Sequence, residues 1–121
     1  MIGSALGWAL MLGMTALGLA ACAFPLPVSD LYGAPQRDRV GAAWVRAAGL
    51  RDLGLSLALA AFLASGARGA AGMVALSTAL VALGDFSSVF ALRGRAAALP
   101  LAVHFSGIAV GLGAAALLGI R

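Results

Sequence analysis

Five ionisable side chains interrupt the long apolar stretches of this 121-residue sequence: Arg46, Arg51, Asp52, Asp85 and His104. A charged or strongly polar group in apolar surroundings is costly unless it has a partner, a ligand or water. A carboxyl group beside an imidazole can exchange protons with a bound molecule, and histidine ordinarily titrates near neutral pH. We therefore identify Asp52, Asp85 and His104 as candidate catalytic residues for acid–base chemistry.

Helical phase indicates which side chains accompany these residues, because positions three and four apart share one face of a helix. On that basis Arg46 and Ser56 are expected on the face of Asp52, and Ser88 follows the second aspartate by one turn. Arg51 is about 100° from Asp52 around the helix, so we expect it to reach a different helix neighbour. The candidate ligand-binding residues are Arg46, Arg51, Ser56 and Ser88.

Four apolar stretches must position these residues, and each is long enough to form a membrane-spanning helix of about 20 residues. They cover about residues 2–24, 41–64, 70–92 and 96–120. The chain is 63% hydrophobic and only 10% charged, whereas about a quarter of the residues are charged in an ordinary soluble domain. The sequence therefore predicts an all-α fold: one integral membrane domain over residues 1–121, a four-helix transmembrane bundle with antiparallel, up-down neighbours.

The connections between these stretches predict an orientation. Residues 25–40 form the longest polar segment, which we expect to be a loop lying partly at the membrane interface. Arginines 37, 39, 93 and 95 fall on the side of the first and third connections, and arginines 68 and 121 on the other side. Because arginine is enriched in cytoplasmic loops, we expect a multi-pass protein of the bacterial inner (cytoplasmic) membrane with both termini outside. The five ionisable side chains then share the cytoplasmic leaflet.

Composition argues against several other classes of protein. The net charge of +4 comes from eight arginines and four aspartates spread along the chain, too sparse for a nucleic-acid-binding surface. One cysteine, Cys22, and one histidine cannot build a structural zinc site or an intramolecular disulfide. We expect no metal and no cofactor, and we expect the partners to be the lipid bilayer and a hydrophobic small molecule.

Two features of the first and last stretches have competing interpretations. Residues 19–22, Leu-Ala-Ala-Cys, have the residue types of a lipoprotein cleavage box, but residues 1–8 lack the positive charge of a signal peptide, which favours a permanent helix. Gly3 with Gly7, and Gly107 with Gly111, have the four-residue spacing that lets helix backbones approach closely. These glycine-rich faces are candidate surfaces for a homo-oligomer.

Three short motifs carry a resemblance to a known family. They are residues 49–52, Gly-Leu-Arg-Asp, residues 83–85, Leu-Gly-Asp, and His104. From about Trp44 onward the chain resembles the domain of unknown function 4267 family, found in bacteria and fungi. The resemblance implies a four-helix membrane protein with polar positions at Arg51, Asp52, Asp85 and His104, and it implies no particular activity. In size and helix count the chain also resembles membrane proteins associated with anthrone oxidation.

These observations leave three hypotheses. The first is a membrane enzyme or binder for a lipophilic small molecule, where proton transfer would suit isomerisation or a cofactor-free oxidation. The second is a small transporter or channel-like subunit, in which the charged residues line a water path. The third is a structural or assembly protein, in which arginine–aspartate pairs only fix the packing of the helices.

Overall fold

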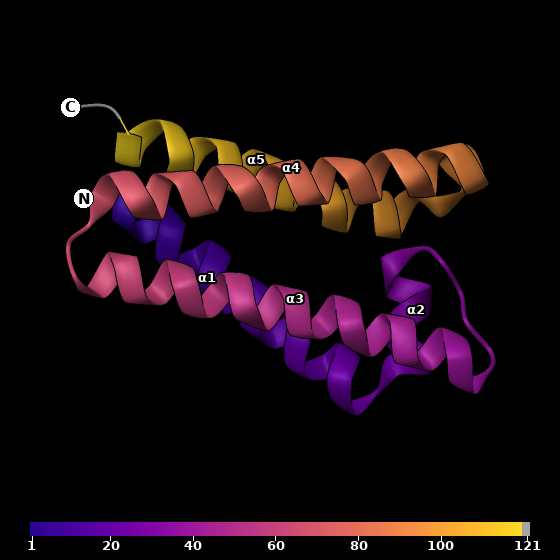
Figure 1. Cartoon of the computed structure of the whole chain (residues 1–121). Helices are drawn as coiled ribbons and strands as arrows, with labels where there is room; N and C mark the ends of the chain where they lie inside the picture. The colour runs from indigo at the N-terminus through magenta and orange to yellow at the C-terminus, as the bar shows by residue number, and fades with distance from the viewer. Residues whose placement is uncertain (120–121) are drawn as a thin grey trace.

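The computed structural model describes residues 1–119, and four long helices dominate it (Figure 1). The elements are α1 (Ile2–Ala23), α2 (Pro25–Tyr32), α3 (Arg39–Ala64), α4 (Arg68–Arg93), the 3-10 helix η1 (Gly94–Ala97) and α5 (Ala98–Gly119). The four long helices confirm the all-α, four-helix fold. Ile120, the end of the fourth predicted span, and Arg121 lie outside the described residues.

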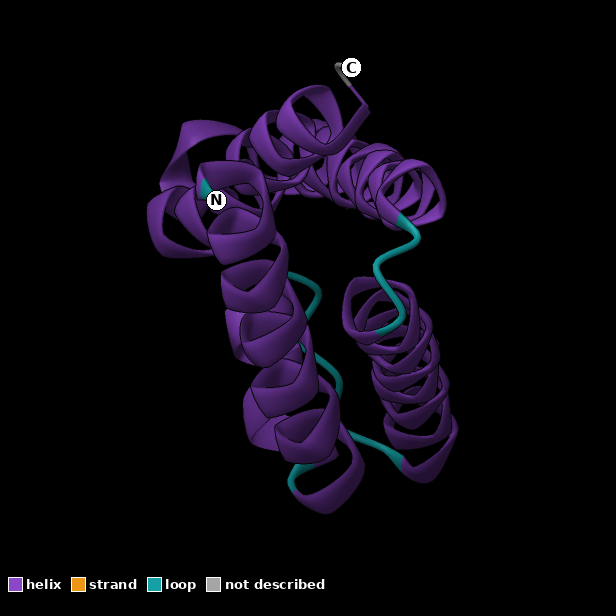
Figure 2. Ribbon diagram, turned by 90° about the vertical axis from the view of Figure 1, so that its left-hand side faces the viewer, coloured by secondary structure: helices purple, strands orange, loops and turns teal. Residues whose placement is uncertain are grey.

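The long helices pack as two antiparallel pairs, α1 with α3 and α4 with α5. The pairs lie close together at the end that carries both termini, and they diverge toward the other end, where α2 lies between them (Figure 1). Figure 2, turned toward the end with the termini, shows that short loops connect the helices. The side chains of Arg51, Asp52, Asp85 and His104 lie in the region where the pairs diverge.

The apolar residues divide into a small core and large exposed faces. The main core joins α1, α3, α4 and α5 through Leu10, Met14, Leu59, Ala71, Ala75, Ala114 and Leu118. Large apolar side chains are exposed along the outside, for example Leu50, Leu57 and Leu80. The described residues contain three helical segments long and apolar enough to cross a membrane: α1, α3, and the 52-residue run from Arg68 to Gly119, which folds back on itself as α4 and α5. The chain is therefore a membrane protein.

The prediction of a loop over residues 25–40 was wrong for its first half, which forms α2. Pro25 cannot continue α1, but its fixed backbone angle suits the first turn of a new helix. Gly33 ends α2 in the left-handed conformation, with φ of 84°, as glycine often does after a helix. Its Cα lies so close to Val89 and Pro100 that an added Cβ would be 2.7 Å from Val89 Cγ1. This fit fixes the end of α2 against α4 and α5.

The glycine faces expected to bind a second copy are used inside the bundle instead. A Cβ at Gly3 would be 2.9 Å from Leu117 Cβ, and one at Gly111 would be 2.9 Å from Ala79 Cβ. Gly7 is likewise buried, against Leu63. Small residues allow this close packing because no bulky side chain separates the backbones, and in lipid such packing contacts replace the missing hydrophobic driving force. The chain itself therefore occupies these surfaces.

Close packing of α1 on α3 gives a first testable prediction. A Cβ at Gly49 would lie 2.8 Å from both Ala21 Cβ and the Gly18 carbonyl oxygen, whereas one at Gly54, in the same helix, meets nothing within 4 Å. We expect Gly49→Ala to lower the free energy of unfolding by about 1–3 kcal/mol. Gly54→Ala should be neutral or stabilising by up to about 1 kcal/mol. Unfolding in detergent micelles measures both, and equal effects would contradict the close contact.

Candidate functional site

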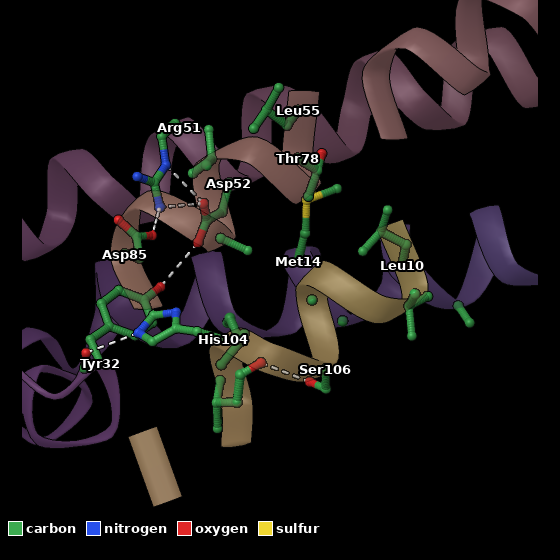
Figure 3. A pocket seen from close by; sticks show the side chains of 18 residues that line it. Leu10, Met14, Tyr32, Arg51, Asp52, Leu55, Thr78, Asp85, His104 and Ser106 are labelled. Atoms are coloured by element: carbon green, nitrogen blue, oxygen red, sulfur yellow. Dashed lines mark hydrogen bonds and ion pairs between the residues drawn. The ribbon is translucent and has the colours of Figure 1, made fainter. Parts of the chain in front are cut away.

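Arg51 lies at the centre of a group of polar side chains from four helices, which we call the polar cluster: Tyr32, Arg51, Asp52, Asp85 and His104 (Figure 3). Its Nε and Nη2 donate to Oδ1 of Asp52 at 3.1 and 3.0 Å. The same Nη2 donates to Oδ2 of Asp85 at 3.1 Å, across to α4. One guanidinium thus bridges two carboxylates and joins α3 to α4.

Tyr32, at the end of α2, connects the carboxylates to the histidine. Its hydroxyl donates to Oδ2 of Asp52 at 3.2 Å, and its carbonyl oxygen is 3.0 Å from Nε2 of His104. A carbonyl oxygen can only accept, so Nε2 must carry the proton, and Nδ1 of a neutral ring is then an acceptor. His104 is only 9% exposed. Its ring centroid is 6.4 Å from that of Tyr32.

The position of Tyr32 raises the pKa of its phenol. Burial is the largest cause, and the negative charge of Asp52 is the second. Both favour the neutral phenol over the phenolate. Tyr32 therefore remains a hydrogen-bond donor to Asp52 well into the alkaline range.

This perturbation can be measured directly, because Tyr32 is the single tyrosine of the chain. We expect its phenolate absorbance to develop only above the ordinary tyrosine pKa of about 10. The contribution of the neutral phenol to the free energy of unfolding is complete below about pH 10, the ordinary tyrosine pKa. It is lost as the pH rises from that value through the raised pKa of the folded protein. In Asp52→Asn the midpoint should fall but stay above the ordinary value, because the burial persists. The exposed Asp30→Asn serves as the control, and a wild-type midpoint at or below about 10 would refute the assignment.

A cavity of about 210 Å³ opens beside the polar cluster, between the diverging helix pairs, and we call it the inner cavity. All five members of the polar cluster line one side of it. Most of the remaining wall is apolar, with Leu10, Met14, Leu17, Leu55, Val81, Val103 and Val110. Leu10 and Met14 also belong to the main core, which closes the cavity toward the end with the termini. The inner cavity is thus apolar at one end and charged at the other.

A second cavity of about 340 Å³, the outer cavity, lies on the other side of the same side chains. It shares Tyr32, Arg51, Asp85 and His104 with the inner cavity. Its other lining residues come from α2, the segment that follows it, and the ends of α3 and α4, among them Ser29, Gln36 and Trp44. Most of the polar cluster therefore separates an apolar chamber from an outer vestibule.

The structure brings together the three candidate catalytic residues and Arg51, but not the other candidates. Arg46 is exposed, and its Nε donates to the Cys22 carbonyl oxygen at the end of α1 at 3.3 Å. Placing it on the face of Asp52 was wrong, because six residues at about 100° each leave it about 120° away. Arg51 was expected to reach a neighbour on a different helix, and it does so through Asp85 on α4. Its long side chain also turns toward Asp52, which helical phase did not predict.

The two candidate serines lie outside the inner cavity. Ser56 is buried between helices, with its hydroxyl 3.1 Å from that of Thr15 on α1. Ser88 lines the outer cavity, and its hydroxyl donates to the Gly84 carbonyl within its own helix. Sequence reasoning missed Tyr32 as a site residue because it placed residues 25–40 in a loop. The proline before it and the glycine after it were the available signals of a short helix.

The chain matches a known protein family over most of its length. Residues 11–118 match the family described as Domain of unknown function (DUF4267). The chain belongs to this family. The match begins well before Trp44, so it includes most of α1 and all of α2 with Tyr32, not only the part of the chain that carries the short motifs. Comparison with curated proteins and with solved structures finds no match.

The chemistry available to this member of the family follows from the geometry. Two carboxylates, a phenol and an imidazole meet at the charged end of an apolar cavity, so protons can pass between them and a bound molecule. Among residues 1–119, no group of three or more His, Cys, Asp or Glu side chains is arranged to hold a metal ion.

Proposed function

We propose that the protein binds a lipophilic small molecule within the membrane and exchanges a proton with its polar end. The apolar body would occupy the inner cavity, and the polar end would lie at the polar cluster. The observation that carries this proposal is that the inner cavity combines a mostly apolar wall with one side formed by ionisable residues. Binding sites for small molecules commonly combine an apolar wall with a few well-placed polar groups.

Asp85 and His104 are the groups best placed for proton exchange. Asp52 already accepts hydrogen bonds from Arg51 and Tyr32 and is only 13% exposed at its side chain, whereas the Asp85 side chain is 36% exposed. Nε2 of His104 contacts the Tyr32 carbonyl oxygen, so Nδ1 is the ring nitrogen that can interact with a ligand. Isomerisation by removal and return of a proton is the reaction class that these residues support without further groups. Arg51 and Tyr32 then hold Asp52 in place.

A neutral probe tests the binding step. Ligands that bind only the folded state stabilise it, by about 1.4 kcal/mol at ten times Kd. We expect 1-octanol to raise the unfolding temperature of the purified protein in a saturable manner in detergent micelles. An unfolding temperature that only falls or never responds, over the range in which the micelles stay intact, would argue against the site.

The charge distribution also supports an orientation in the membrane. Arg37, Arg39, Arg93 and Arg95 lie near the end of the bundle that carries α2 and the polar cluster, and Arg68 lies at the other end. We place the α2 end in the cytoplasm of a bacterium and the termini outside, following the enrichment of arginine in cytoplasmic loops. A C-terminal alkaline phosphatase fusion should then be active, and an inactive fusion with an active cytoplasmic reporter would reverse this assignment.

A structural role is the second candidate, because the ion pair of Arg51 with Asp85 directly joins α3 to α4. Transport finds less support, since the main core closes the inner cavity on its far side. Formation of homo-oligomers would need a surface other than the glycine faces packed inside the bundle.

A further inference from the structure

The charges of the polar cluster do not balance. Arg51 supplies one positive charge, while Asp52 and Asp85 supply two negative charges when both are ionised. Among residues 1–119, no second arginine forms an ion pair with either carboxylate; Arg37 pairs with Asp30 instead. A surplus charge in apolar surroundings needs a counter-charge or a proton. With both carboxylates ionised and the His104 ring neutral, the cluster therefore lacks one positive charge.

The unused hydrogen-bonding capacity of the cluster consists mostly of acceptors. Asp85 accepts one hydrogen bond, on Oδ2, so its Oδ1 has no donor among the described residues. Nδ1 of His104, on a side chain more than nine-tenths buried, likewise has no partner in residues 1–119. Both residues line the inner cavity. A ligand at this position meets two acceptors in need of a donor.

The remaining donor does not change this balance. Nη1 of Arg51 makes no hydrogen bond within residues 1–119, but its guanidinium already pairs with two carboxylates. A carboxylate or phosphate ligand would add negative charge to a cluster that already has an excess of it, which costs free energy in an apolar site. An anionic head group is therefore disfavoured, although an arginine is present.

We infer that the ligand is a lipophilic amine, bound as its ammonium form. The ammonium group donates to the free oxygen of Asp85 and to Nδ1 of His104, and it supplies the missing positive charge. Its apolar body lies along Met14, Leu55 and Val103 in the inner cavity. This inference rests on the proposed function and specifies the ligand class of the same site.

Three probes with equal chains and different head groups test it: octylamine, 1-octanol and octanoate. Their affinities are measured by titration calorimetry on protein in phosphatidylcholine nanodiscs at pH 7, with empty nanodiscs to correct for partition into lipid. We expect octylamine to bind at least tenfold more tightly than octanoate and more tightly than 1-octanol. Octanoate or 1-octanol binding at least as tightly as octylamine would overturn the inference.

Variants connect this preference to the surplus charge. In Asp85→Asn the preference for octylamine over 1-octanol should fall about tenfold, whereas Asp30→Asn, the same change in an exposed ion pair, should retain it. An unchanged preference in a folded Asp85→Asn variant would overturn the inference. If that variant does not fold, the comparison of the three probes on the wild type decides. Failure of all three to bind would instead refute the proposed function itself.

Discussion

Replacement of Arg51 by glutamine is expected to lower the free energy of unfolding by about 2–4 kcal/mol, the largest effect of any single change in the polar cluster. Two carboxylates lose their counter-ion at once, and Asp52 is mostly buried. The expected loss is smaller than for a fully buried pair because the Asp85 side chain is still 36% exposed. Reversible unfolding in detergent micelles, followed by circular dichroism, measures this difference.

Two variants separate the loss of the ion pairs in the polar cluster from other effects of replacing an arginine. Arg37 makes an ion pair of similar length with Asp30, at 2.8 Å, but both side chains are more than half exposed. We expect Arg37→Gln to cost less than about 1 kcal/mol. Adding Asp52→Asn and Asp85→Asn to Arg51→Gln removes the uncompensated charges and should recover most of the lost stability. A triple variant no more stable than the single variant would contradict this electrostatic account.

The same variants separate the structural role from the proposed function. If the ion pairs served packing alone, a triple variant with recovered stability would still respond to 1-octanol as the wild type does. If the polar cluster holds the polar end of a ligand, the stable triple variant should lose that response. Stability and binding therefore have to be measured on the same preparations.

The second large effect is expected from filling the inner cavity. Gly13 lines this cavity, and a Cβ built there meets nothing within 4 Å. A side chain can therefore begin here, at the cavity wall, without moving the backbone. We expect Gly13→Leu to weaken the binding of 1-octanol at least tenfold, by occupying the volume that the ligand needs, while the unfolding temperature without ligand stays the same or rises.

Gly54→Leu is the matched control for this change. Gly54 also lies inside a long helix, and a Cβ there has open space, but it does not line either cavity. This variant should bind 1-octanol as the wild type does. Equal binding by wild type, Gly13→Leu and Gly54→Leu would place the probe in the detergent or on the outer surface instead of the cavity.

The sequence predicted the four long helices well, because long apolar stretches separated by glycine, proline and arginine are a strong signal. It also predicted that Asp52, Asp85 and His104 would share one end of the bundle, since antiparallel helices bring those positions to the same depth. Their contacts were harder to predict. The sequence named both Arg46 and Arg51 as candidates, and helical phase put Arg46, not Arg51, on the face of Asp52. The reach of the long side chains decided the actual arrangement, in which Arg51 contacts Asp52 and Asp85.

The place of Tyr32 in the polar cluster could not be predicted from the sequence. Its role depends on α2 folding back between α3 and α5, a tertiary arrangement set by the fit of Gly33 against Val89 and Pro100. No periodic pattern in eight residues reports such packing. Burial of the glycine faces within the bundle could not be predicted for the same reason. Four-residue spacing predicts that helices approach closely, but not which helices do so.

Photolabelling tests the central claim most directly, using an analogue of 1-octanol that carries a diazirine on its alkyl chain. After irradiation of the protein in nanodiscs, mass spectrometry of the peptides identifies the labelled residues. We predict label at residues of the inner cavity wall, such as Met14, Leu55 and Val103, that excess 1-octanol displaces and that Gly13→Leu loses. Label confined to exposed outer residues such as Leu57 and Leu80, unaffected by competitor or variant, would contradict the account.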